Sequence, residues 1–125
     1  MADLLVTVLK GPARFSPDVI VEAARATWPD SPQSPPAESL GANSLAMLEV
    51  HDGRQIILVD FLGVHEGLGV DGDDDLAGRF LAWLTNHIDM SRSQVVVSDW
   101  ADDLIALAPG MRPDDVARLR GGGHR

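Results

Sequence analysis

Apolar residues recur three and four positions apart in two stretches of the chain, residues 17–28 and 76–88. This spacing puts them along one side of an α-helix, so we predict two amphipathic helices. The first should begin after Ser16, a favourable N-cap residue, and end at Pro29, which cannot continue a helix. The second should carry its apolar side on Leu76, Phe80, Leu84 and Ile88.

Four other stretches are rich in β-branched and apolar residues, which is typical of strands. Residues 4–10 and 93–99 form two of them. The other two flank Asp52–Gly53, a residue pair favoured in two-residue hairpin turns. A turn at this pair predicts the cross-strand pairs, among them His51 with Arg54, Val50 with Gln55, and Leu48 with Ile57.

The remaining segments have no strong period. Residues 29–42 hold four prolines and should form an extended loop. Residues 63–75, rich in glycine and aspartate, should also form a loop. Residues 100–108 favour a short helix or turn, residues 112–120 a last short helix, and residues 121–125 a flexible tail.

The predicted order of elements is β-α-β-β-α-β, followed by a short helical segment. The simplest packing is an α+β fold with a four-stranded antiparallel sheet and both helices on one face, the ferredoxin-like split βαβ arrangement. We expect residues 1–120 to form one such domain. The fold class carries little functional information, since it occurs in proteins with many functions.

Both faces of the predicted hairpin are largely apolar. One face holds Ala46, Leu48, Val50, Ile57, Val59 and Phe61, and the other holds Leu45, Met47, Ile56 and Leu58. Helices on one side of the sheet would leave the second face exposed as an unusual apolar patch. We expect a cover for it: the C-terminal segment with Leu104, Ile105 and Leu107, a second copy of the chain, or a partner protein.

Negative charge is concentrated in one part of the chain. The net charge is −9, and residues 60–103 hold ten acidic and two basic residues, a net of −8. Such a segment repels the phosphate backbone, which argues against nucleic-acid binding. It would instead attract a basic protein and guide its approach.

Composition also limits the compartment and the chemistry. The chain has no cysteine, which excludes disulfides, cysteine nucleophiles and cysteine-ligated metal centres. The start of the chain lacks the features of a signal peptide, and no apolar run reaches the roughly 18 residues of a membrane span. We therefore expect a soluble cytoplasmic protein, and the near-absence of lysine beside many arginines suggests a bacterial source.

The aspartates of residues 71–75 partly resemble a calcium-binding loop, since Asp71, Asp73 and Asp75 alternate as in an EF-hand. The glycine and the glutamate that such a loop requires are replaced by Leu76 and Ala82. The start of a helix explains the acids more simply, because aspartates cap helices and oppose the positive end of the helix dipole. We expect no metal site here.

Catalytic and cofactor-binding motifs are absent from the sequence. His65 and Glu66 stand close to the acidic loop and, with Trp83, are the first candidates for a small-molecule site. The serines lack a nucleophile motif, and the glycines match no phosphate or dinucleotide loop. We predict no cofactor and no catalytic residue.

The leading hypothesis is therefore a small acidic interaction protein without catalytic activity. In size, acidity and lack of motifs it resembles immunity proteins or inhibitors that neutralise a basic toxin or enzyme. The residues expected to attract the partner are Asp71, Asp73, Asp74, Asp75, Asp99, Asp102 and Asp103. The alternative is a dimeric ferredoxin-like domain that binds or transforms a small molecule and pairs through the face of its sheet.

Overall fold

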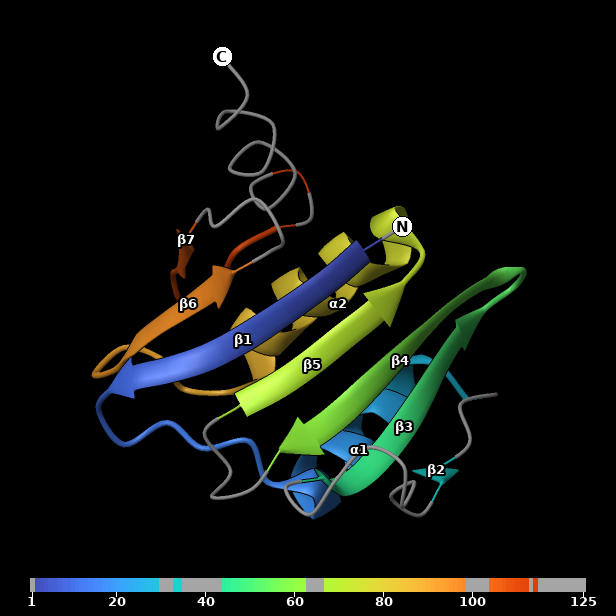
Figure 1. Ribbon diagram of the computed structural model, residues 1–125, viewed down its shortest axis with the longest axis horizontal. Coiled ribbons are helices and arrows are strands. Elements are labelled where there is room, and N and C mark those ends of the chain that lie inside the picture. The colour runs from blue at the N-terminus through green and yellow to red at the C-terminus, as the bar shows by residue number, and fades with distance from the viewer. Residues whose placement is uncertain are drawn as a thin grey trace.

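The computed structural model describes residues 2–29, 33–34, 44–62, 67–98, 104–112 and 114. In this part of the chain the fold is α+β, as the sequence predicts (Figure 1). Its elements are β1 (Ala2–Lys10), α1 (Pro17–Thr27), β2 (Gln33–Ser34), β3 (Ser44–Asp52), β4 (Gln55–Leu62), β5 (Gly67–Gly72), α2 (Asp74–His87), β6 (Gln94–Ser98) and β7 (Leu104–Leu107).

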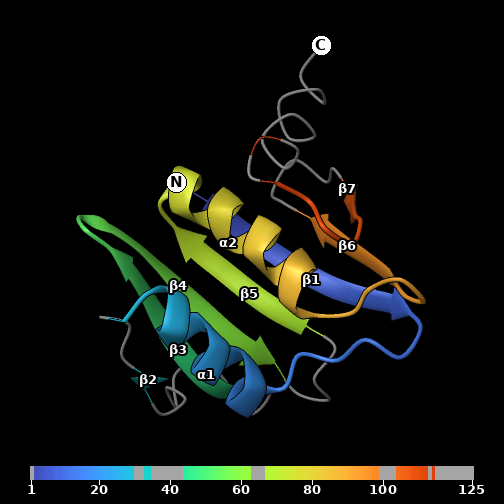
Figure 2. The same cartoon turned by 180° about the vertical axis from the view of Figure 1, so that it is seen from behind.

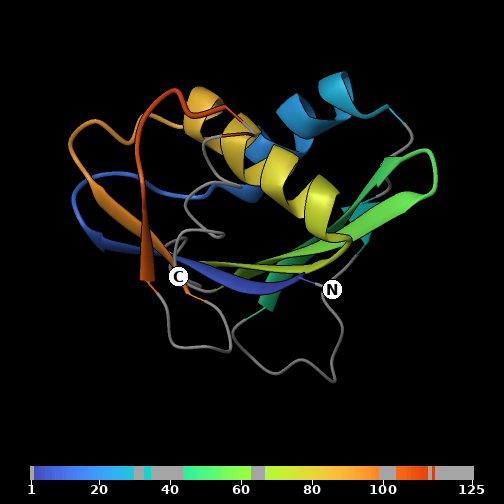
Figure 3. The same ribbon diagram turned by 90° about the horizontal axis from the view of Figure 1, so that it is seen from above.

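The described strands form one antiparallel sheet in the order β2-β3-β4-β5-β1-β6-β7. Seen from behind, α1 and α2 both lie in front of the sheet, and the view from above places them together on one side of it (Figures 2 and 3). The predicted placement of both helices on one face is therefore confirmed.

The four-stranded ferredoxin-like layout is not confirmed, because the sheet contains strands that the sequence does not predict. That layout requires β1 to pair with the second strand of the hairpin, β4, but β5 lies between them. Because β5 is inserted between β1 and β4, these two strands run parallel to each other. Strand β3, the hairpin partner of β4, therefore runs antiparallel to β1, and α1 connects two antiparallel strands. A split βαβ unit exists only in the second half, where β5 and β6 run parallel on either side of β1.

The prediction of a loop is wrong for residues 67–72, which form β5 in the middle of the sheet. Three of its six residues are glycines, which usually mark turns and are unfavourable in strands. The alternation of Leu68 and Val70 with smaller residues explains the strand, since both side chains are fully buried. Gly72 ends it with φ +132°, a conformation that favours glycine.

The prediction of a helix or turn over residues 100–108 is also wrong for its described part. Residues 104–107 form β7, which pairs with β6 at the edge of the sheet. The stability gained by burying Leu107 and by pairing with β6 is larger than the helix preference of so short a segment. A turn at Pro109–Gly110 follows β7.

The hairpin of β3 and β4 forms, but with a different register from the predicted one. Asp52 pairs with Gln55, so Gly53 and Arg54 form the turn. Val50 consequently faces Ile57, two residues from its predicted partner. A shift of two residues keeps every side chain on its predicted face.

Both predicted helices are confirmed, and their apolar sides fill the core. Ser16 occupies the N-cap of α1 and Pro17 its first helical position, as expected. In α2, Leu76, Phe80 and Leu84 are fully buried. They pack in one apolar cluster with the inward residues of the sheet, among them Val6, Leu48, Val50, Ile57, Val59, Phe61, Leu68 and Val70.

Candidate functional site: the open sheet face and the start of α2

The face of the sheet away from the helices, which we call the open face, is the surface toward the viewer in Figure 1. Neither described helix covers it, since both pack on the other side (Figures 2 and 3). Along β1, β4 and β5 its side chains alternate with the buried core residues, whereas on β6 Val95, Val96 and Val97 are all buried. Large apolar side chains reach solvent there: Leu5 is 41% exposed, Leu9 51% and Ile56 44%.

The charged side chains of the open face are acidic. Glu49 of β3, Asp60 of β4 and Asp71 of β5 have outward side chains on this face. These three strands contain no lysine or arginine. His51 lies beside Glu49, with 3.5 Å between Nε2 and Oε2. The base that ends β1, Lys10, lies at the far end of that strand from Leu5. The open face therefore combines apolar and negative groups.

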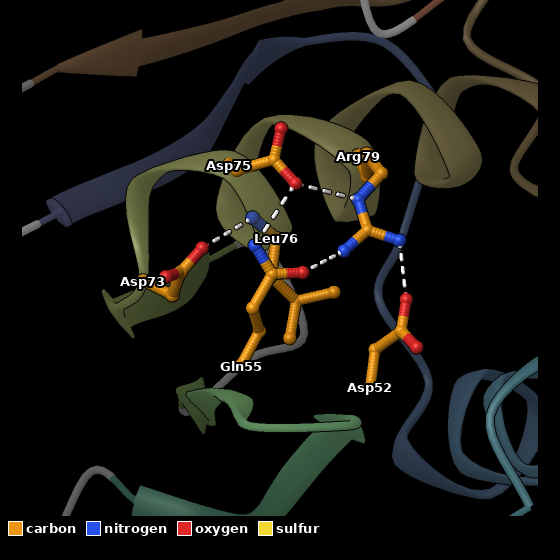
Figure 4. Close-up of polar contacts among 6 residues, drawn as sticks. All are labelled: Asp52, Gln55, Asp73, Asp75, Leu76 and Arg79. Atoms are coloured by element: carbon orange, nitrogen blue, oxygen red, sulfur yellow. Dashed lines mark hydrogen bonds and ion pairs between the residues drawn. The ribbon is translucent and has the colours of Figure 1, made fainter.

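Asp73 is committed to the start of α2. Its carboxylate accepts the backbone N–H of Leu76 at 2.9 Å, so Asp73 is the one of these aspartates that caps the helix (Figure 4). Its own backbone N–H donates to the Ile56 carbonyl at 3.1 Å. This second bond ties the helix start to β4.

Asp75 belongs to a polar cluster around Arg79 that joins α2 to the tip of the β3–β4 hairpin (Figure 4). The Nε–H of Arg79 donates to Asp75 at 3.0 Å, and its terminal nitrogens bond Asp52 and Gln55. The Gln55 amide also donates to Asp75, at 3.1 Å. Hydrogen bonding to Asp52, aided by the nearby charge of Asp75, raises the pKa of Arg79 further above its already high usual range.

The predicted partner-binding aspartates thus have different surroundings. Asp73 and Asp75 hold the helix start and the hairpin in place. Asp71 and Asp74 have exposed side chains, Asp71 on the open face and Asp74 in the first turn of α2. The other predicted residues, Asp99, Asp102 and Asp103, lie outside the described residues.

Of the predicted small-molecule site, only Trp83 lies in the described part of the chain; His65 and Glu66 do not. Trp83 is largely buried between the two helices. Its ring stacks on His87 with centroids 4.3 Å apart, and its Nε1–H donates to Thr27 Oγ1 at 3.1 Å. These contacts give Trp83 a structural role in holding α1 against α2.

The described residues were compared with three other kinds of feature: a surface depression, a metal-binding cluster and a membrane-spanning helix. A shallow depression of ≈ 280 Å³ lies on α1, away from the predicted site residues, and is lined by Asp18, Val21, Glu22 and Arg25. Among the described residues, no three histidines or acids lie close enough together to hold a metal ion. No described helix has the length and apolar character needed to cross a bilayer.

Sequence reasoning missed two features of this surface. The Arg79 cluster depends on the hairpin turn meeting α2, although the spacing of Asp75 and Arg79 is that of a helical ion pair. The outward glycines Gly67 and Gly69 belong to a strand where the glycine content predicts a loop, and the signal for the strand is the alternation of Leu68 and Val70.

The fold and this surface define an α+β protein with an exposed, apolar and acidic sheet face. Comparison with known protein families, curated proteins and solved structures found no match to the chain. Its function must therefore be inferred from its own residues.

Proposed function

We propose that the chain is a small acidic interaction protein without catalytic activity, which binds and neutralises a basic protein, as immunity proteins and inhibitors do. The proposed setting is the bacterial cytoplasm, and the partner is a basic toxin or enzyme. The observation that carries the proposal is the open face, on which large apolar side chains are exposed beside acids.

The two kinds of side chain would contribute differently to binding. Leu5, Leu9 and Ile56 would supply most of the binding free energy, because burial of apolar surface at the centre of an interface dominates affinity. The acids would mainly accelerate association and select a basic partner. A partner of matching character has arginines and lysines around an apolar patch.

The acids at the start of α2 extend this surface around the C-terminal end of the central strand β5. Asp71 lies on the open face one residue before Gly72, and Asp74 follows in the first turn of α2. We retain Asp73, Asp75, Asp99, Asp102 and Asp103 as contributors to the negative field. Asp73 and Asp75 also have structural partners, so their loss would alter the fold locally as well as the field.

The test begins with the purified full chain immobilised as bait for a lysate of its host. Captured proteins are identified, purified and titrated against the chain by calorimetry at low and high salt. We expect a basic protein whose affinity falls as salt rises. Leu5→Ser should accelerate its dissociation, and Asp71→Asn should slow its association.

Val19→Ser is the matched control, because Val19 is 58% exposed on α1, on the other side of the sheet. It should leave binding unchanged. An affinity indifferent to salt, or equal effects of Leu5→Ser and Val19→Ser, would contradict the proposal. So would a stable homodimer that buries the open face, which is the arrangement expected for the alternative small-molecule domain.

A further inference from the structure

Two residues near the end of α2 hold the turn that follows β7. Thr85 is buried, and its Oγ1 accepts the backbone N–H of Met111 at 2.9 Å. The Thr85 carbonyl oxygen accepts the N–H of Gly110 at 3.2 Å. The Asn86 side-chain amide donates to the Met111 carbonyl oxygen at 2.9 Å. We call Thr85 and Asn86 the latch, and residues 104–111 the strap.

The latch side chains are themselves fixed on α2. The Thr85 hydroxyl donates to the Ala82 carbonyl oxygen at 2.7 Å, and the Asn86 amide donates to the same oxygen at 2.8 Å. Both side chains are therefore held against the helix and present their remaining bonding atoms to the strap. The Thr85 hydroxyl thus donates to the helix and accepts from the strap.

The turn at the end of the strap is shaped to meet the latch. Gly110 has φ +73°, in the left-handed region that favours glycine. The Met111 sulfur accepts the Ala108 N–H at 3.3 Å, which closes the turn on itself. Leu107 and Met111 are both buried in the apolar core. The strap is therefore anchored by two apolar side chains and by three hydrogen bonds to α2.

The strand part of the strap has fewer supports among the described residues. β7 has four residues and lies at the edge of the sheet, where β6 is its one described neighbour. Ala106 in the middle of β7 is exposed. Short edge strands with few neighbours belong to the least stable parts of a fold. The pairing of β7 therefore depends on the anchor at the end of α2.

We propose that the strap opens and closes as one unit and that the latch sets the equilibrium between the two forms. In the closed form β7 is the edge of the sheet. In the open form the edge is β6, where Val95, Val96 and Val97 lose their neighbouring strand. The inference does not rest on the proposed function, because neither latch residue belongs to the surface assigned to the partner.

The strand and the turn should open together because partly open forms are costly. Leu107 ends β7 beside Val95, three residues before Gly110, so loss of the β6–β7 pairing also displaces the turn. Release of Met111 alone would separate its N–H from the Thr85 hydroxyl while Thr85 stays buried. An unmade bond of a buried group is unfavourable, and complete opening lets water satisfy both groups.

The test measures amide hydrogen exchange by NMR on the full chain labelled with ¹⁵N, at increasing urea concentrations below denaturation. We expect the amides of Gly110 and Met111 and those bonded between β6 and β7 to exchange with one common free energy of opening. Its dependence on urea should be weaker than for the amides of β1 and β5, because opening the strap exposes less surface than global unfolding.

Two variants weaken the latch. Thr85→Val removes the hydroxyl at nearly constant volume and leaves the Met111 N–H without its acceptor. It should speed exchange of Met111 and of the β6–β7 amides by the same factor, about tenfold. Asn86→Ala, at an exposed position, should speed both sets by a smaller common factor. If Thr85→Val does not fold, Asn86→Ala alone carries this test.

Gly78→Ala is the matched control on the same helix, because a Cβ at Gly78 meets nothing within 4 Å. Alanine favours a helix more than glycine does, so this variant should slow exchange that requires global unfolding. It should leave exchange of the strap amides unchanged, since α2 remains helical at this position when the strap is open.

A disulfide provides the reverse experiment, because the chain has no cysteine of its own. Val96 and Ala106 are paired across β6 and β7, a placement that suits a disulfide between Val96→Cys and Ala106→Cys. The oxidised protein should exchange the amides of Gly110 and Met111 at least about tenfold more slowly than the same protein reduced.

Several results would overturn the inference. Strap amides with the urea dependence of β1 and β5 would show that the strap opens only by global unfolding. Effects of Asn86→Ala confined to Gly110 and Met111, or no slowing of these amides in the oxidised protein, would show that strand and turn open separately. Unprotected amides at Gly110 and Met111 would show that the latch bonds do not form. Equal slowing of strap and β1 amides by Gly78→Ala would also contradict a separate unit.

Discussion

Asp73 stabilises the start of α2 in two ways: it accepts a backbone hydrogen bond, and its negative charge lies at the positive end of the helix dipole. Its carboxylate accepts the Leu76 N–H, which has no partner within the helix itself. We predict that Asp73→Ala lowers the free energy of unfolding by about 1 kcal/mol, the usual value of an N-cap. Urea denaturation would measure the loss, and Asp73→Asn should restore most of it. An equal loss in Asp74→Ala would assign the effect to the helix dipole instead.

Asp89 lies just after α2 and provides a test of pH dependence. Hydrogen bonds from the Ser91 hydroxyl, at 2.6 Å, and the Ser91 backbone N–H, at 3.0 Å, lower the pKa of Asp89 below its ordinary 3.8. Because the folded value is depressed, this contribution to stability is present above the ordinary pKa. It is lost as the pH falls through the lower, folded value.

We predict that Ser91→Ala raises the pKa of Asp89 toward its ordinary value, because the hydroxyl bond is the larger of the two causes. An NMR titration of the Asp89 carboxyl carbon would measure the midpoint in both proteins. An unchanged midpoint would show that the backbone bond alone sets it.

At the scale of elements, Arg79 of α2 joins the helix to the hairpin tip through Asp52 and Gln55, and it pairs with Asp75 within the helix. We predict a coupling energy between Asp52 and Arg79 of about 0.2–1 kcal/mol, the range of partly exposed ion pairs. A double-mutant cycle with Asp52→Asn and Arg79→Gln would measure it, and high salt should reduce it. Arg54→Gln, in the same turn, is the control, and coupling of similar size there would show a general charge effect.

The elements also differ in how well the sequence predicts them. Both helices follow from their apolar spacing, from Ser16 and Pro17 at the start of the first, and from the run of aspartates at the start of the second, because caps and periodicity are local properties. β5 is harder to predict, since its glycines have low strand propensity and mask the alternation of Leu68 and Val70, and pairing with β4 and β1 helps to stabilise it. β7 depends in the same way on pairing with β6.

At the scale of the whole molecule, net charge and the open face have opposite effects on association. The net charge of −9 opposes contact between copies at neutral pH, whereas Leu5, Leu9 and Ile56 favour it. We predict self-association as the pH approaches the isoelectric point of ≈ 4.6. Light scattering against pH should show it, and Leu5→Ser with Ile56→Ser should suppress it more than Val19→Ser. Equal suppression by Val19→Ser would mean that the open face is not the contact.

The sequence by itself determined the α+β class, the two helices with their starts, the β3–β4 hairpin and the concentration of negative charge. These properties depend on local periodicity, capping and composition. Only the tertiary structure decided the position of β5 between β4 and β1, the pairing of β7, and the meeting of Arg79 with the hairpin tip. It also decided that Gly69 lies between Leu5 and Asp60, because register between distant strands results from long-range packing.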